Sequence, residues 1–500
     1  MSTTTEPVVR TYGHWRKPAS AGLGSFGLLG TLVIFAGMLT MLITMMLFNI
    51  IAAAIVVIPF LIVLGLLLMR DKHGRNLGQR LGTRLAWRKA RKAGANVYRS
   101  GPLGRTPWGR HQLPGVAARS RLSEHTDSYG RRFALVHMPT TNHYAVVLEV
   151  QPDGGALVDQ AQIDVWVAHW GNWLANLANE TNVAAAAVII ETAPDTGARL
   201  RREVNLNLRE DAPLLAKSML RQVVDIYPRG SAAIRAWITL TVRGVDASGN
   251  RQKPEAVAGE LASRLPHLTA TLSATGAGAS HTVDAYDLCE IVRIAFDPVT
   301  APLFDQAHAD GERVDLDWSD VGPSAHDATD VSYRHDGALS TSWVMSQAPR
   351  GLSLSSCLTG LLSPHRDIAR KRVALLYRPI PSGVSAGIVE ADKRNADFVV
   401  KNSTRPSARA LAGQAAATAT ASEEARGAGL VNFGMVVTAT VDDPKNLPTA
   451  RAAVESLSAS ARILLRPAYG SQDTAFAAAL PLGLVLPAHL KVPAALRSMI

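Results

Sequence analysis

The stretch that decides the fold of this chain is residues 26–69, which read FGLLGTLVIFAGMLTMLITMMLFNIIAAAIVVIPFLIVLGLLLM. Between Lys17 and Arg70 the sequence holds no Asp, Glu, Lys, Arg or His. One membrane-spanning helix needs about 20 apolar residues, so this run is about twice the required length. A signal peptide would carry a shorter apolar region. The sequence therefore predicts a two-helix transmembrane hairpin, with helices over about Phe26–Leu47 and Ile50–Met69.

The charges that flank the apolar run are basic on both sides. Arg10, Arg16 and Lys17 precede it. Nine basic residues follow it closely: Arg70, Lys72, Arg75, Arg80, Arg84, Arg88, Lys89, Arg91 and Lys92. Cytoplasmic flanks of membrane helices are rich in Lys and Arg. We therefore expect a multi-pass protein of the cell (inner) membrane, with both termini and the bulk of the chain in the cytoplasm.

The same nine basic residues predict a membrane-surface site. The formal net charge is +11, and residues 70–121 alone hold 14 basic residues against one acidic residue. Juxtamembrane Lys and Arg each gain about 1 kcal/mol from anionic lipid. Leu77, Leu81 and Leu85 recur at helical spacing beside these arginines, which favours an amphipathic helix on the membrane surface. Direct contact of this basic stripe with DNA phosphates is an open alternative.

The rest of the chain alternates strand-like and helix-like stretches, which predicts an α/β or α+β fold of packed layers. We expect a cytoplasmic tail at 1–25, the hairpin at 26–69, a basic helix and arm at 70–122, a first α/β unit at 123–295, a polar connector of irregular structure at 296–370 and a second α/β unit at 371–500. In each unit a strand and a polar loop precede a helix that begins near a proline. This similarity indicates either an internal duplication or a pattern common to α/β proteins.

The sequence offers little catalytic chemistry. A phosphate-binding loop requires Gly-Lys before Ser or Thr, and no Gly-Lys pair occurs in this chain. Residues 22–27 match Gly-x-Gly-x-x-Gly, but they open an apolar helix instead of following a strand. The sequence thus excludes a standard P-loop ATPase, and we expect no catalytic residue, cofactor site or metal site.

Ser385 and the two cysteines are the candidate nucleophiles. Ser385 lies in Gly383-Val-Ser-Ala-Gly387, the pattern of a nucleophile elbow, but prolines separate it from the preceding predicted strand. We therefore expect a loop without catalytic function. Cys289, in a predicted strand, and Cys357 are expected to be small hydrophobic residues of the interior.

Three histidines lie among many aspartates in the predicted connector. They are His308, His326 and His335. Their spacing matches no zinc-binding pattern, so we expect a solvated acidic loop.

Three segments of the chain resemble proteins of conjugative type IV secretion systems. They are RVALLYRP at 372–379, EEARGAG at 423–429 and QDTAFAAALPLG at 472–483. With the hairpin, the chain resembles the two-helix inner-membrane protein of these systems fused to the N-terminal, non-ATPase domain of their ATPase, in an actinobacterial form. The resemblance implies a non-catalytic component that anchors and docks a separate secretion ATPase and works as an oligomer among other secretion subunits.

The resemblance also implies where the partner docks. In the related ATPases a similar aromatic-to-Leu-Pro segment lies just before the ATPase domain, so Phe476, Leu480 and Pro481 are the expected docking anchors. The alternative is that Phe476 closes the core of its own domain. Two further functions remain as alternatives, namely a membrane subunit of a type VII secretion complex and a membrane-anchored enzyme that uses Ser385.

Overall fold

The computed structural model describes residues 10–13, 15, 27–48, 50–69, 71, 73–101, 104, 110–155, 157–180, 182–227, 231–349 and 351–490. The chain divides into two compact units. One is built mainly from Lys17–Gly94 and the other mainly from Ala95–His489.

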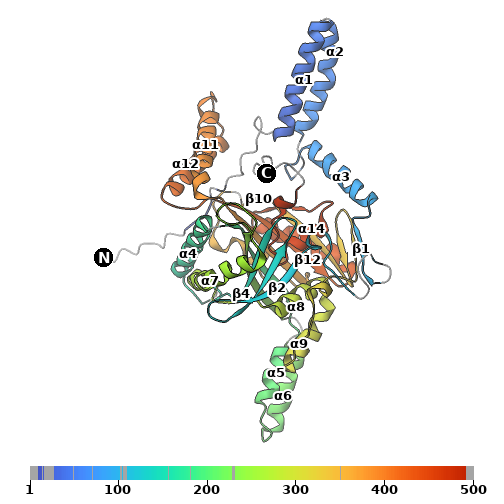
Figure 1. Ribbon diagram of the computed structural model, residues 1–500, viewed down its shortest axis with the longest axis vertical. Helices are drawn as coiled ribbons and strands as arrows, with labels where there is room; N and C mark the ends of the chain where they lie inside the picture. Colours follow the sequence, from blue (N-terminus) through green and yellow to red (C-terminus); the bar gives the residue numbers. More distant parts are fainter. Residues whose placement is uncertain are drawn as a thin grey trace, which may run out of the picture. The chain divides into compact units, whose positions relative to one another are not determined.

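The described residues of the Lys17–Gly94 unit form three helices, α1 (Gly27–Leu47), α2 (Ile50–Leu68) and α3 (Leu77–Lys92). α1 and α2 lie side by side as a hairpin (Figure 1). The ring of Phe60 in α2 packs directly against Gly37 in α1, where any side chain would collide with it.

One helix in the described part of the chain is long and apolar enough to cross a membrane, and it is the Gly30–Leu47 stretch of α1. A helix therefore forms at the first predicted span, with a length and composition that would allow it to cross a membrane. α2 also forms where a helix was predicted, with Pro59 inside it. It does not count as a second such helix among the described residues, so the second span stays a prediction.

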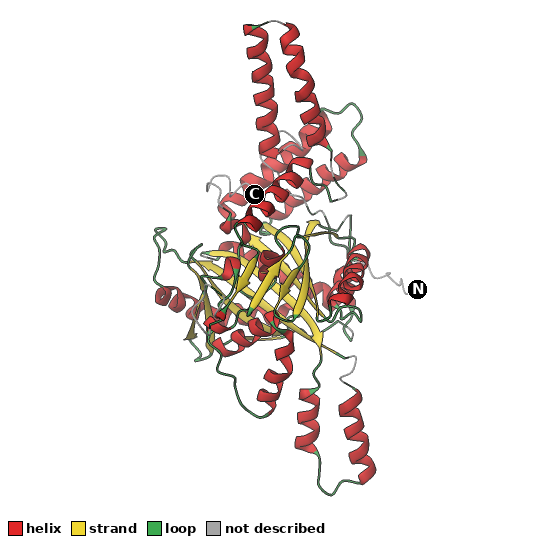
Figure 2. Cartoon of the chain, turned by 90° about the vertical axis from the view of Figure 1, so that its right-hand side faces the viewer, coloured by secondary structure: helices red, strands yellow, loops and turns green. Residues whose placement is uncertain are grey.

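The Ala95–His489 unit is built on one antiparallel sheet, which the described residues form from 13 strands (Figure 2). The strands are β1 (Val97–Arg99), β2 (Arg121–Thr126), β3 (Arg132–Met138), β4 (His143–Gln151), β5 (Val183–Pro194), β6 (Ala232–Arg243), β7 (Ala279–Thr282), β8 (Ala325–Ala328), β9 (Tyr333–His335), β10 (Ala338–Gln347), β11 (Arg370–Pro379), β12 (Val431–Val441) and β13 (Leu464–Pro467). Their order across the sheet is β1-β8-β9-β10-β12-β11-β5-β6-β4-β3-β2, with β7 beside β4 and β13 beside β10.

The helices of this unit connect or cover the strands. They are α4 (Gln160–Asn179), α5 (Ala198–Asn207), α6 (Leu214–Ile226), α7 (Pro254–Leu272), α8 (Ala285–Phe296), α9 (Ala301–Ala309), α10 (Thr359–Leu362), α11 (Ser382–Lys401), α12 (Ala408–Ala425), α13 (Leu447–Ser460) and α14 (Gln472–Ala478).

The order of these elements is repeated in the two halves of the sheet. The first half runs β4-α4-β5-β6-α7-β7 and the second runs β10-α10-β11-β12-α13-β13. The strand orders are β7-β4-β6-β5 and β13-β10-β12-β11, which is the β-α-β-β-α-β arrangement of ferredoxin-like units. Each half also inserts a helical hairpin between its second and third strands along the chain: α5–α6 lies between β5 and β6, and α11–α12 lies between β11 and β12. The structure thus supports the duplication interpretation, and β5 pairs with β11 to join the halves.

The first face of the sheet carries the apolar cores. On β6, Ile238 and Leu240 face this side because alternate residues of a strand point to opposite faces. α4 and α7 cover it in the first half, with Trp173 fully inside. α13 covers it in the second half, where Val454 packs against Val437 of β12.

The second face of the central strands is buried but polar. Thr239 and Thr241 of β6 and Thr438 and Thr440 of β12 are all nearly inaccessible to solvent. α14 packs against β9, β10 and β12 on this half of the sheet, and α8 packs against β2 and β3. Segments after the last strand of each half therefore complete the second layer.

The prediction of an irregular connector at 296–370 is wrong. This segment holds α9, β8, β9 and β10, and β10 pairs with β12 along six residues. The sequence pattern did not reveal β10, because this strand is polar. Ser340, Thr341 and Ser342 are buried through hydrogen bonds and not through apolar packing. Cys289 likewise lies in helix α8 and not in a strand.

The predicted alternation of strands and helices is otherwise confirmed. β3 and β4 pair as a hairpin, and β5, β6, β11 and β12 form at apolar runs of the sequence. α7 extends to Leu272, with Pro266 inside the helix.

Candidate functional sites

The basic residues predicted at the membrane surface lie on and before α3. Arg70 and Lys72 fall outside the described residues. Arg75 precedes the helix and pairs with Asp71, with 3.2 Å between Nε and Oδ2. On α3 itself Arg80 is half-buried and five further cations are exposed: Arg84, Arg88, Lys89, Arg91 and Lys92.

α3 has the chemistry of a helix that lies on a lipid surface. It contains no acidic residue, and none of its side chains is buried. Leu81 and Leu85 are 55% and 62% exposed, so they are available to enter the headgroup region beside the cations.

We expect replacement of Arg84, Arg88 and Arg91 together by Gln to weaken lipid binding strongly. Each charge contributes about 1 kcal/mol at an anionic surface, so a peptide of residues 73–94 should lose about a hundredfold in partitioning. The measurement is tryptophan fluorescence of Trp87 during titration with phosphatidylglycerol-containing vesicles. Pure phosphatidylcholine vesicles are the control, on which both peptides should bind alike. Equal binding to anionic vesicles would contradict a membrane-surface role.

The three residues predicted to dock a partner are inside the protein. Phe476 is 0% exposed and Leu480 is 2% exposed. Pro481 is buried as well. The segment that follows lies flat on the second face of the sheet, where Thr241 Oγ1 donates to the carbonyl of Gly483 at 3.1 Å. A side chain at Gly483, which has a φ of 66°, would collide with Ala145. The docking prediction is therefore wrong, and the core alternative is correct.

Phe476 is the centre of an aromatic cluster that joins α8, α14 and β9. Its ring centroid lies 5.2 Å from that of Phe296, 5.1 Å from that of Tyr333 and 4.6 Å from that of His335. The guanidinium of Arg372 lies over the same ring at 5.6 Å. These contacts account for the Phe in the segment at 472–483.

Two of the three connector histidines belong to this interior. His335 Nδ1 lies 2.6 Å from the carbonyl of Phe296 and therefore donates to it, which leaves Nε2 to accept from Ser340 Oγ at 2.7 Å. His326 Nδ1 lies 2.7 Å from the hydroxyl of Tyr333. Burial lowers the pKa of both histidines to about 4, so both are neutral at pH 7.

The prediction of a solvated acidic loop is thus wrong for His326 and His335. His308 is exposed, as predicted, but it lies in helix α9 and not in a loop, with Nε2 3.0 Å from Glu290 Oε2. In the described part of the chain no three His, Cys, Asp or Glu side chains are placed to hold a metal ion.

A buried charge cluster crosses the junction between the two halves, and the sequence analysis missed it. Glu191 of β5 accepts from Arg370 Nη1 at 2.6 Å and from Arg372 Nε at 2.9 Å, both on β11. All three residues are at most 8% exposed. Burial alone would raise the pKa of Glu191, but Arg370 and Arg372 hold it below its usual value. The two arginines alternate with Lys371 in the sequence, a period that places both on one face of a strand.

Ser385 is not in a loop, because it lies in the first turns of α11. Its Oγ donates to Glu424 Oε1 on α12 at 2.7 Å and is also 3.0 Å from the carbonyl of Ser382. The side chain is 2% exposed. Ser385 therefore links the two helices of the α11–α12 hairpin, and no histidine is among its hydrogen-bond partners. Burial raises the pKa of Cys289 to about 12, which makes this thiol a poor nucleophile.

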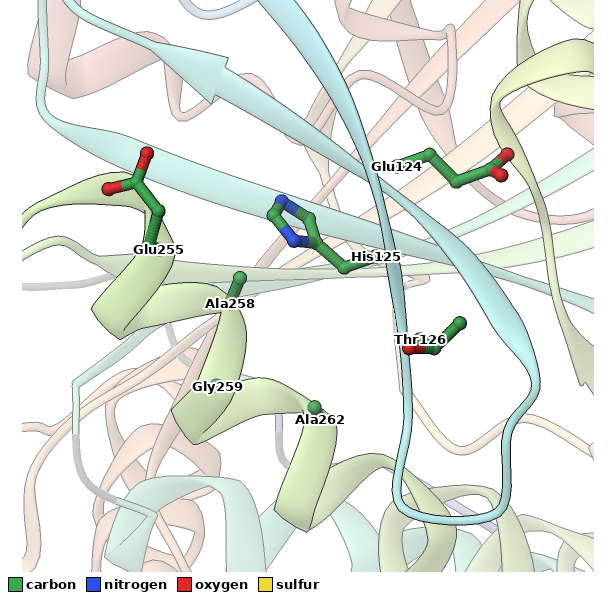
Figure 3. Close-up of a pocket in the computed structure, with 7 residues that line it drawn as sticks. All are labelled: Glu124, His125, Thr126, Glu255, Ala258, Gly259 and Ala262. Carbon is green, nitrogen blue, oxygen red and sulfur yellow. The ribbon is translucent and has the colours of Figure 1, made fainter.

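A surface pocket with a volume of about 450 Å³ lies between β2 and α7. Figure 3 shows the imidazole of His125 directed from β2 toward α7, whereas Glu124 points away from it. Ala258, Gly259 and Ala262 form the α7 side. Small residues on the helix leave the space open, and no sequence motif signals it.

Exposed apolar side chains gather on the α5–α6 hairpin, which projects from the sheet (Figures 1 and 2). α6 has no buried residue. Leu214, Leu215 and Met219 are 84%, 71% and 59% exposed. Exposed apolar patches of this kind mark surfaces that partners or membranes cover.

Comparison with known proteins gives one family match. Residues 19–79 match a family model described as "Domain of unknown function (DUF8461)". The match covers α1, α2 and the beginning of α3. No curated protein matches the chain.

Proposed function

We propose that this protein is a non-catalytic structural component of a secretion or conjugative DNA-transfer apparatus, anchored in the cell membrane by α1 and α2, with its sheet unit in the cytoplasm. The observation that carries the proposal is the uncharged α1–α2 hairpin followed directly by the basic, acid-free helix α3. This is the pattern of two spans whose exit lies on the cytoplasmic surface.

The character of the sheet unit favours a structural role over an enzymatic one. Its reactive groups are engaged internally: Ser385 is bound to Glu424 and His335 to Ser340. The exposed apolar side chains of α6 indicate a member of a complex. We infer that the principal partner is a separate secretion ATPase, as the sequence resemblance implies.

We expect cysteine labelling to place the sheet unit in the cytoplasm. In a background without Cys289 and Cys357, Tyr129→Cys should resist a membrane-impermeant maleimide in intact cells and react after permeabilisation, because Tyr129 is 76% exposed. Phe48→Cys, at the turn between α1 and α2, should react from outside. Labelling of Tyr129→Cys in intact cells would show that α1 is the single span and would overturn the two-span topology.

We expect affinity purification of the full chain from its native membrane to capture a P-loop ATPase. The purified chain alone should show no ATP hydrolysis, because no Gly-Lys pair exists to cradle phosphates. A conjugation-type ATPase in the eluate supports the type IV role, whereas type VII core subunits would favour the alternative. Hydrolysis that persists in the isolated chain would refute the non-catalytic assignment.

A further inference from the structure

The two ends of the sheet differ in one respect. β8 and β2 lie toward opposite ends of the strand order. β8 pairs with β9, and β2 pairs with β3. β8 is covered on its outer side by β1, which pairs with it antiparallel through Val97–Arg99. β2 is the terminal strand of the sheet, and no described strand pairs with its outer side. An exposed strand edge presents unpaired N–H and C=O groups that template a further strand.

The space next to β2 is suited to an added strand. Neighbouring strands lie about 4.8 Å apart. The pocket of about 450 Å³ between β2 and α7 borders this terminal strand and can take side chains of an added one. Gly259 has open space where a Cβ would be, so the α7 wall is recessed. Ser128, two residues after β2, donates from its backbone N–H to Ala262 O at 3.3 Å, which closes one end of the groove.

The groove carries an unneutralised negative charge. Glu255 lines the pocket from the first turn of α7, is exposed and makes no ion pair with any described Lys, Arg or His. Glu124 lies on the other face of β2, where it accepts from the N–H of Ala285 at 3.1 Å. Arg121 and Arg251 do not line the cavity. A cationic side chain in the groove would therefore find Glu255 unpaired.

We propose that β2 and α7 form a docking groove for an extended peptide segment of a partner protein. The segment adds to β2 as an antiparallel strand, as β1 does on β8, and places a Lys or Arg side chain against Glu255. Backbone pairing supplies the affinity and the cavity selects the side chains, the division found in other strand-addition sites. The proposal does not depend on the secretion role.

The test uses the full chain in detergent and a phage-displayed library of random linear peptides. We expect selected peptides to be rich in Lys or Arg and to bind, by fluorescence anisotropy, at least tenfold more weakly to Gly259→Leu. The leucine fills the groove, and it is a better helix former than glycine. Gly171→Leu is the matched control, because Gly171 is an exposed glycine of α4 with equal open space. That variant should bind like wild type.

Two further readouts make the result specific. Glu255→Gln should weaken the basic peptides several-fold at low salt and much less at high salt. Hydrogen exchange of the β2 amides should slow when peptide is bound. The proposal is overturned if no binder is selected, or if binders ignore Gly259→Leu. It is also overturned if the chain self-associates through this edge and Gly259→Leu abolishes that association, since a second copy would then be the occupant.

Discussion

Glu191→Ala is expected to destabilise the sheet unit by about 3–5 kcal/mol, because it leaves Arg370 and Arg372 buried without a counter-charge. A loss of this size is a large share of the roughly 5–15 kcal/mol that holds a domain together. Urea unfolding of the detergent-solubilised chain, followed by circular dichroism, measures it.

Asp211→Ala is the control for this prediction. Asp211 also pairs with an arginine, Arg209, at 2.7 Å, but these side chains are 70% and 79% exposed. Ion pairs exposed to solvent contribute little to stability, so the control should leave the urea midpoint nearly unchanged. Similar losses of stability in the two variants would contradict the prediction that Arg370 and Arg372 are costly to leave without a counter-charge.

The same cluster sets a pH dependence. Because the pKa of folded Glu191 is below its unfolded value, its contribution is complete above the unfolded pKa and is lost as pH falls through the folded pKa. The stability difference between wild type and Glu191→Gln should therefore shrink on acidification.

Phe476→Ala is expected to cost about 3–5 kcal/mol, the usual loss for a fully buried phenylalanine. The cavity would open among Phe296, Tyr333 and His335, which cannot all collapse into it because His335 is fixed by two hydrogen bonds. The melting temperature of the purified chain reports the effect. Phe398→Ala on α11, where the ring is 68% exposed, should change stability by less than about 0.5 kcal/mol. A Phe476→Ala protein as stable as wild type would restore the docking interpretation.

The sequence allowed prediction of elements whose side chains follow apolar patterns. β5, β6, β11 and β12 contain runs of Val, Ile, Leu and Ala, which bury without needing partners, so their positions were predictable. β10 was not, because its Ser340 and Ser342 are compatible with a strand only when Thr440 and Thr438 lie opposite them. That pairing joins residues about a hundred positions apart, which local patterns do not reveal.

Among the candidate sites, too, features set by local sequence were predictable and features set by distant contacts were not. The basic helix α3 was predictable because its charges lie within 13 residues of one another in the sequence. Phe476 was recognised as important but was placed on the surface, since a short apolar segment looks alike in a core and in an interface. The groove beside β2 depends on which strand ends the sheet, and that depends on the whole topology.

The pairing of β5 with β11 has a consequence for how this molecule could arise and change. Two equal units that meet edge to edge in antiparallel fashion are the single-chain counterpart of a two-fold symmetric homodimer. In a homodimer every substitution appears twice, so both ends must remain the same. Fusion into one polypeptide removes that constraint, and each end can then be altered alone. Here one end has gained the strand β1, while the other has kept its edge available.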